Sequence, residues 1–111
     1  MEEQKIPYDD WAKIELRIAT IINVKPHPNA EKLYILTLDL GDKKKELVAG
    51  IREVYTEEEL LGKQIAVFVN LEPKVIRGVL SEGMILAASD GVNKPAIVTV
   101  EHKVNNNAKI R

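Results

Sequence analysis

The stretch that decides the fold is VFVNLEPKVIRGVLSEGMILAAS, residues 67–89, in which two apolar runs flank a more polar segment. The first run predicts a strand that ends at Asn70, and Pro73 stops its ladder because proline has no N–H to donate. The second run predicts another strand. Between the two we expect a loop that carries the cations Lys74 and Arg77. Such a loop offers a surface for phosphates and sugar hydroxyls.

The segments before this stretch predict the rest of a small barrel. Alternating apolar residues indicate strands, and a Thr-Glu-Glu-Glu run with capping-box spacing indicates a short helix. In chain order, these are strands at 16–24, 34–40 and 46–49, a helix at 56–61, and strands at 64–70 and 83–88. Three strands, a helix and two strands is the order of the five-stranded Greek-key barrel of the OB-fold. The expected fold class is therefore all-β, an OB-fold barrel with short helices.

Two extensions flank this barrel, which is expected to occupy residues 14–89 of a single domain. Asp9 or Asp10 is expected to cap a short helix that plugs one end of the sheet. Residues 90–111 form a C-terminal extension, in which residues 96–100 read as a strand without a partner in a five-stranded barrel. Because an uncovered strand edge tends to pair, we expect this extension to form a homodimer.

Composition limits the class of protein. The chain has 111 residues, 45% of them apolar and 30% charged, and no cysteine, which is typical of a folded domain without disulfides. The acidic start and the short apolar runs favour the cytoplasm over a membrane. Residues 1–60 carry nine cationic and thirteen acidic side chains, a charge of −4, and residues 61–111 carry seven and four, a charge of +3. A polyanion should meet the C-terminal half, unless the asymmetry is a chance property of a solvated surface.

Patterns typical of catalysis do not occur in the sequence. His27 and His102 are far apart, and there is no metalloprotease, nucleophile-elbow, Walker or Rossmann motif. We therefore expect no enzyme activity, no metal, no cofactor and no small-molecule substrate. Five aromatic residues without an RNP-like aromatic strand also disfavour base stacking, whereas reading of phosphates and RNA shape is still allowed.

Three blocks of sequence carry a family resemblance: AKIELRIATIINVKPHPNAEKLYILTLDLG at 12–41, LVAGI at 47–51, and YTEEELLGKQIAVFVNLEPKVIRGVLSEGMILAAS at 55–89. Together they resemble the tRNA-binding domain family. That family includes stand-alone tRNA-binding dimers, the C-terminal domain or separate beta subunit of methionyl-tRNA synthetase, and CsaA-like export chaperones. The resemblance covers residues 8–111. It implies an OB-fold that binds tRNA by shape near the outer corner of the L, dimerises through segments beyond the barrel, and neither catalyses a reaction nor holds a cofactor.

The resemblance also implies binding residues. They come from an Asn-Leu-x-Pro-x motif, a Ser-x-Gly-Met motif and an HPNA-x-KL block, to which the second loop cation is added. The candidate nucleic-acid-binding residues are Asn29, Lys32, Asn70, Lys74, Arg77, Ser81 and Met84.

Most of these candidates also have a plainer interpretation. Asn70 can cap a strand end, Ser81 can bond its own backbone, and Met84 can fill a gap in the core. The cations Lys74 and Arg77 can be ordinary solvated side chains.

Three other charged positions need an interpretation. Glu82 replaces the glutamine of many family members, and because a carboxylate repels phosphate it should point away or pair with a loop cation. Arg17 alternates with apolar residues, so we expect it to pair with a carboxylate such as Glu15 or Glu46 and to be structural. The run of lysines at 43–45 is expected to be a solubilising hairpin tip, with a secondary phosphate contact as the alternative.

The expected function is non-catalytic tRNA binding through shape and phosphate contacts. The protein would act either alone or as the beta subunit that assists methionyl-tRNA synthetase. The alternative is a CsaA-like export chaperone that binds unfolded polypeptide, and such a protein should expose a sizeable apolar patch.

Overall fold

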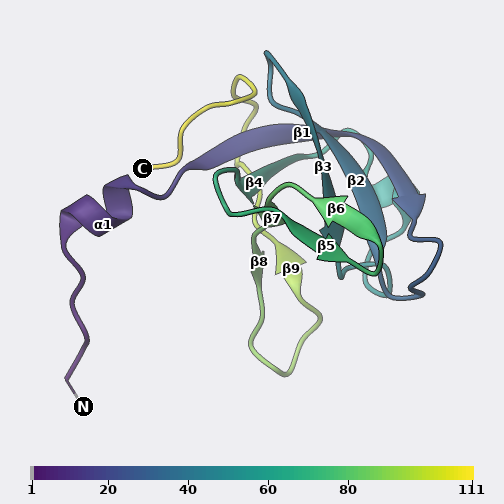
Figure 1. The fold of residues 1–111 in the computed structure, drawn as a ribbon, viewed down its shortest axis with the longest axis horizontal. Coiled ribbons are helices and arrows are strands. Elements are labelled where there is room, and N and C mark those ends of the chain that lie inside the picture. The colour runs from purple at the N-terminus through teal and green to yellow at the C-terminus, as the bar shows by residue number, and fades with distance from the viewer. Residues whose placement is uncertain (1) are drawn as a thin grey trace.

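The computed structural model describes residues 2–111 and is built on one curled antiparallel sheet (Figure 1). In chain order the strands of this sheet are β1 (Leu16–Pro26), β2 (Tyr34–Asp39), β3 (Lys44–Ala49), β4 (Gln64–Phe68) and β7 (Met84–Ile85). Their order across the sheet is β3-β2-β1-β4-β7. The expected five-stranded OB-fold barrel is thus confirmed.

The long strand β1 makes the sheet bend. Its first half pairs with β4 and its second half with β2, and Thr20 pairs with both strands. The register with β2 shifts between Ile21 and Asn23, which is the signature of a β-bulge and increases the local bend. Because the strand curves around the core, buried side chains occur on both of its faces, as the apolar residues on both faces predicted.

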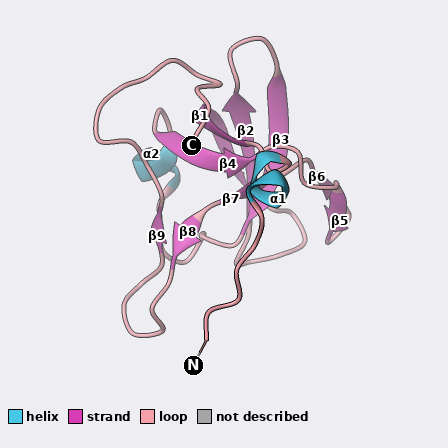
Figure 2. Ribbon diagram, turned by 90° about the vertical axis from the view of Figure 1, so that its left-hand side faces the viewer, coloured by secondary structure: helices cyan, strands magenta, loops and turns pink. Residues whose placement is uncertain are grey.

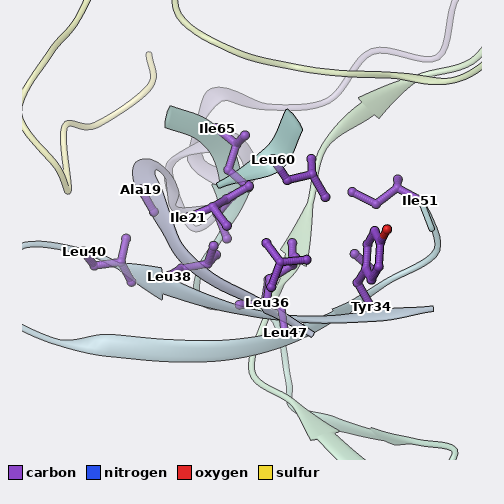
Figure 3. Packing of buried hydrophobic residues seen from close by; sticks show 13 residues of the cluster. Ala19, Ile21, Tyr34, Leu36, Leu38, Leu40, Leu47, Ile51, Leu60 and Ile65 are labelled. Carbon is purple, nitrogen blue, oxygen red and sulfur yellow. The ribbon is translucent and has the colours of Figure 1, made fainter. Parts of the chain in front are cut away.

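Aliphatic side chains fill the barrel (Figure 3). The fully buried ones include Ile21, Leu36, Leu38, Leu40, Leu47, Leu60, Ile65 and Val67. Leu60 comes from α2 (Glu57–Leu60), whose predicted capping box is confirmed. The backbone N–H of Glu59 donates to Thr56 Oγ1 at 3.1 Å, and the Thr56 N–H donates to Glu59 Oε1 at 2.8 Å. These bonds start the helix where it can place Leu60 in the core.

The polar segment between β4 and β7 is a hairpin, so the prediction that this whole segment is a loop was wrong. Strand β5 (Lys74–Ile76) pairs with β6 (Val79–Ser81). Aliphatic residues on both strands favour this pairing, and Pro73 precedes the new strand, where its missing N–H costs no ladder bond. The predicted strand at 83–88 is likewise divided into β7 and β8 (Ala87–Ala88).

The C-terminal extension finds its partners within the same chain. Strand β9 (Ala96–Ile97) pairs with β8, and Thr99 bridges to Ile65 on β4. Further along, the Ile110 N–H donates to the Leu16 carbonyl of β1 at 2.9 Å. The expectation of a strand without a partner was therefore wrong, and the argument for a homodimer that rested on it no longer holds.

The N-terminal helix α1 (Tyr8–Ala12) stands away from the barrel, with its leading arm extended (Figures 1 and 2). Its N-cap is Pro7, which has no side-chain cap, so the predicted aspartate cap was wrong. Asp9 and Asp10 lie in the first turn, where carboxylates suit the helix dipole. The helix does not plug the sheet as expected. No helix within residues 2–111 is long and apolar enough to cross a membrane.

Candidate nucleic-acid interface

The β5–β6 hairpin projects one arginine at its tip. Ile76 pairs with Val79, so the turn consists of two residues, Arg77 and Gly78. Both have positive φ, 53° and 88°, as in a type I′ turn. Positive φ is uncommon for a residue with a Cβ, and the pairing on either side of the turn holds Arg77 there. The result is an exposed guanidinium at the end of a short, tightly turned hairpin.

This tip meets the loop between β1 and β2. Arg77 and residues 29–33 line a surface hollow of about 500 Å³. The structure therefore brings together three of the predicted contacts, Asn29, Lys32 and Arg77, whose side chains are exposed. In OB-folds, the loop between the first two strands and the loop between the last two are where oligonucleotides bind. The hollow lies between these two loops.

Lys74, the second predicted cation of this segment, lies at the base of the hairpin. It is exposed on β5, directly opposite Ser81 on β6. Its role as a phosphate contact stays a prediction, as do the roles of the three residues at the hollow. Glu31 also lines the hollow and reduces its positive potential.

Two further residues hold the walls of the hollow, and the sequence analysis assigned a function to neither. Arg52 donates from Nη1 to the Ala30 carbonyl at 3.3 Å. His27 is buried, with 3% of its surface exposed, and both of its ring nitrogens are hydrogen-bonded. No sequence signal marked Arg52, whereas His27 lies within the quoted HPNA block and could have been found there.

Ser81 closes the barrel and does not face solvent. Its hydroxyl accepts the N–H of Val48 on β3 at 3.0 Å and donates to the Gly83 carbonyl at 3.1 Å. Only 3% of Ser81 is exposed. The predicted RNA contact is therefore replaced by a structural role, because the hydroxyl is buried and both of its hydrogen bonds are made within the chain.

Glu82 continues this closure. Its backbone N–H donates to the Glu46 carbonyl at 2.9 Å, and its Oε1 accepts the Glu46 N–H at 3.3 Å. The carboxylate thus binds the edge of β3. One interpretation of the sequence expected it to pair with Arg77 or Lys74, and it does not. The bonds of Ser81 and Glu82 fix the base of the β5–β6 hairpin against β3.

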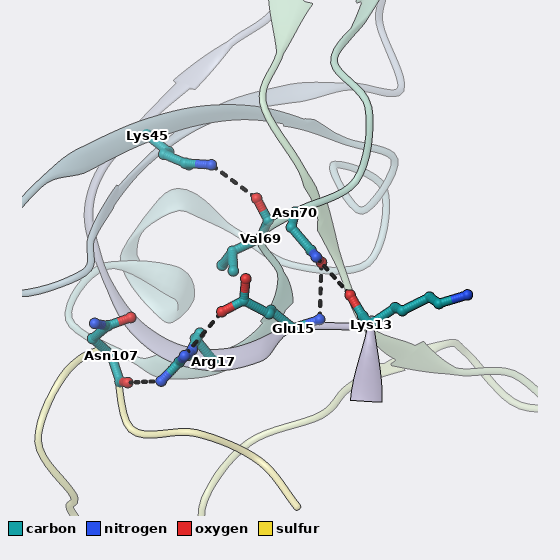
Figure 4. A network of polar contacts seen from close by, with 7 residues as sticks. All are labelled: Lys13, Glu15, Arg17, Lys45, Val69, Asn70 and Asn107. Atoms are coloured by element: carbon teal, nitrogen blue, oxygen red, sulfur yellow. Dashed lines mark hydrogen bonds and ion pairs between the residues drawn. The ribbon is translucent and has the colours of Figure 1, made fainter. Parts of the chain in front are cut away.

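Asn70 joins the end of β4 to the segment that leads into β1 (Figure 4). Its Oδ1 accepts the Glu15 N–H at 2.8 Å, and its Nδ2 donates to the Lys13 carbonyl at 2.7 Å. Both ends of the amide are used in these contacts, so the structure supports the plainer interpretation of a residue that caps a strand end. Met84, on β7, has 46% of its surface exposed and does not line the hollow.

The cations near this end of the barrel are largely engaged within the protein. Arg17 forms an ion pair with Glu15 at 2.9 Å and donates to the Asn107 carbonyl at 3.2 Å, which confirms its expected structural role. The hydrogen bond from Arg17 lowers the pKa of Glu15 below its ordinary value. Lys45 is half-buried and donates to the Val69 carbonyl at 2.8 Å, so within the lysine run at 43–45 it is not a solvated hairpin tip.

No group of three His, Cys, Asp or Glu side chains in residues 2–111 is arranged to hold a metal ion. The polar side chains that are exposed at the hollow include the amide of Asn29 and the cations Lys32 and Arg77. Their arrangement suits binding of an anionic surface through lysine and arginine.

Comparison with known proteins agrees with this geometry. The family model described as "Putative tRNA binding domain" matches residues 16–109. Over 99% of the chain, the sequence is 47% identical to the methionine–tRNA ligase of Pyrococcus abyssi, and over its full length it is 40% identical to that of Methanocaldococcus jannaschii. The chain spans 15% and 17% of the lengths of these two relatives.

Solved structures share the fold over nearly the whole chain. A methionyl-tRNA synthetase-related protein from Pyrococcus horikoshii has a TM-score of 0.91 at 28% identity, with 98% of this chain and 100% of that chain covered. The chaperone CsaA from Bacillus anthracis has a TM-score of 0.89 at 26% identity, with 97% and 100% covered. With the family match over most of the barrel, these likenesses show that the chain belongs to the tRNA-binding domain family.

Proposed function

We propose that the chain binds tRNA, without catalysing a reaction, through the hollow between the 27–33 loop and the β5–β6 hairpin. The observation that carries this proposal is the position of Arg77. The hairpin places its guanidinium beside Asn29 and Lys32, at the place where OB-folds bind oligonucleotides. The membership of the tRNA-binding domain family supports RNA as the anion.

Phosphate and shape, more than base identity, should decide recognition. Of the large exposed apolar side chains in residues 2–111, the one aromatic is Tyr8, which lies on α1 away from the hollow. Bases therefore find no ring beside Arg77 on which to stack. The cations Lys32, Lys74 and Arg77 can contact phosphates along a folded backbone, and the walls of the hollow restrict which shapes fit.

The test is the affinity of single variants for tRNA at several salt concentrations. Arg77→Ala, Lys74→Ala and Lys32→Ala should each weaken binding and lower the salt slope, by an amount on the order of the 0.7 to 0.9 that one phosphate contact contributes on single strands and on B-form DNA. Lys43→Ala is the matched control, because Lys43 is exposed but lies away from the hollow. If Lys43→Ala weakens binding as much as Arg77→Ala, the proposed position of the interface is wrong, and tRNA binds elsewhere on the barrel.

Competition experiments test the reading of shape. Several tRNAs should compete with similar affinity at a fixed salt concentration, and polyuridine of matched length should compete much less well. Equal competition by polyuridine would reduce the interaction to charge attraction. A preference of orders of magnitude for one tRNA would point to a base-specific contact.

We infer that the protein works as a homodimer, in the cytoplasm, either alone or as the beta subunit that assists methionyl-tRNA synthetase. The similarity to methionine–tRNA ligases supports the synthetase as a partner. The exposed N-terminal arm supports the dimer: Ile6 and Tyr8 are 65% and 76% exposed, and Tyr8 borders a hollow with Trp11 and Ile110. Burial of such apolar groups in a second copy would stabilise a dimer.

Sedimentation of full-length protein at micromolar concentration tests the dimer. Ile6→Ser together with Tyr8→Ser should give a monomer. Val92→Ser, which removes an apolar side chain that is 89% exposed on the β8–β9 hairpin, should leave the dimer intact. A wild-type protein that sediments as a monomer would refute the dimer. A co-purified synthetase, or its absence, would decide between the two modes of action.

Binding of unfolded polypeptide is the second candidate, favoured by one surface feature. Val75 and Leu80 face each other across the β5–β6 hairpin and are 63% and 49% exposed. They form an apolar pair that could contact a client, and CsaA chaperones share the fold. If the chain is a chaperone, replacing both residues with serine should abolish its suppression of client aggregation. If the chain only binds tRNA, the same variant should keep the tRNA affinity of the wild-type protein.

A further inference from the structure

His27 is the side chain that joins the two walls of the hollow. Its Nε2 lies 3.0 Å from the carbonyl oxygen of Ile76, the residue directly before Arg77 in the hairpin. Its Nδ1 lies 3.0 Å from the backbone N–H of Asn29. Within residues 2–111, no other hydrogen bond joins the 27–33 loop to the β5–β6 hairpin.

The partners determine the protonation of the ring. A backbone N–H can only donate, so Nδ1 must be an acceptor, and a carbonyl can only accept, so Nε2 must carry the hydrogen. The imidazole is therefore the neutral Nε2–H tautomer. With both nitrogens used and 3% of the residue exposed, the ring has no nitrogen left to bind RNA itself.

The tip of the hairpin needs a stabilising contact such as the hydrogen bond from His27. Each of its strands has only three residues, and an isolated hairpin of this length is not stable in water. Its base is fixed to β3 through residues 81–82. The bond from His27 to Ile76 fixes the other end, next to Arg77. A guanidinium that is already in place loses less conformational entropy when it binds an anion.

We propose that His27 is a positioning residue for RNA binding: its neutral ring holds the hairpin tip so that Arg77 lies beside Asn29 and Lys32. This inference rests on the proposed function of the hollow. It goes further because it assigns the geometry of the interface to a buried side chain that does not touch the RNA.

Two substitutions separate the two bonds of the ring. In His27→Gln, the amide nitrogen can occupy the place of Nε2 and donate to the Ile76 carbonyl, but the bond from Asn29 is lost. In His27→Asn, the carbonyl oxygen can occupy the place of Nδ1 and accept from Asn29, but the side chain is too short to reach Ile76. Each variant keeps one bond and loses one, so the two are matched controls for effects on folding.

The first readout is the Kd for an unmodified tRNA transcript. His27→Gln should stay within about twofold of the wild-type protein, and His27→Asn should bind about tenfold more weakly, as expected for the loss of one well-placed contact. Equal weakening of both variants, in proportion to their stability, would show that His27 only supports folding. Unchanged affinity of His27→Asn would overturn the proposal.

The second readout needs no RNA. The ¹⁵N shifts of the ring should show an unprotonated Nδ1 and a protonated Nε2, and amide relaxation should show Arg77 and Gly78 rigid in the wild-type protein and in His27→Gln but mobile in His27→Asn. A hairpin tip that stays rigid in His27→Asn would refute the role of the bond to Ile76. If the wild-type protein binds no tRNA while relaxation behaves as expected, the proposed function fails and the positioning of the tip by His27 stands.

Discussion

Replacing Ser81 with alanine should destabilise the barrel and leave the interface intact. The substitution removes the acceptor of the Val48 N–H, a buried donor on β3. Leaving such a donor unsatisfied costs about 1–3 kcal/mol. The bond from Ser81 Oγ to the Gly83 carbonyl is lost as well. We expect a loss of about 2 kcal/mol in the free energy of unfolding, which lowers Tm by roughly 10 °C in a domain of this size.

The assay is urea denaturation followed by far-ultraviolet circular dichroism. Fluorescence is a poor probe here, because the single tryptophan, Trp11, lies on α1 away from the barrel. Ser89→Ala, at an exposed position, is the matched control and should change stability by less than about 0.5 kcal/mol. The tRNA affinity of folded Ser81→Ala should stay within about threefold of wild type. Unchanged stability with about tenfold weaker binding would refute the structural role and restore Ser81 as an RNA contact.

Three further predictions concern a pair of glycines, one carboxylate and the C-terminal segment. Gly83→Ala should lower Tm more than Gly62→Ala. Both glycines have positive φ, but a Cβ at Gly83 would lie 2.7 Å from a backbone oxygen of β4, whereas a Cβ at Gly62 would meet nothing within 4 Å. Equal shifts in Tm would contradict this. Hydrogen bonds from the backbone of Asn93 and its neighbour lower the pKa of Asp90 from 3.8 to about 2, so Asp90 stabilises the fold above pH 4 and loses this effect as the pH falls towards 2. The stability difference between wild type and Asp90→Asn should therefore shrink over that range, and a constant difference would argue against the shift. Deleting residues 96–111 should unfold or aggregate the barrel, because these residues bond to β1, β4 and β8; a folded, soluble truncation would contradict their structural role.

The strands of the barrel could be predicted from the sequence because each has a local signal. Alternating apolar residues mark β1 and β2, and the capping box marks α2. The hairpin was missed because its signal is weak: its strands are three residues long, and its turn contains Arg-Gly where Asn-Gly is the strong indicator. The positive φ of Arg77 is imposed by the strand pairing on either side of the turn, and this pairing cannot be read from a single sequence.

The candidate site could be predicted by residue type but not by direction. The sequence singled out cations and amides of the family motifs, and the structure brings three of these candidates, Asn29, Lys32 and Arg77, to one hollow. Whether a hydroxyl such as that of Ser81 faces solvent or a neighbouring strand depends on register, and a shift of one residue reverses it. The same uncertainty applied to Asn70, whose amide joins segments that are 55 and 57 residues away. Long-range contacts of this kind leave no local pattern in the sequence.

The anchors of the interface are separate from its cations, and this separation makes the proposed function testable. The 27–33 loop and the hairpin are held by His27, Arg52, Ser81 and Glu82, each of which bonds to backbone atoms. The side chains of Lys32 and Arg77 take part in none of these bonds. Alanine at either cation should therefore leave the hollow in place, so a loss of tRNA affinity in these variants reports a lost contact. Alanine at His27 or Arg52, which bond directly to the walls of the hollow, changes the hollow itself. Its effect on affinity has to be compared with its effect on stability before a contact is inferred.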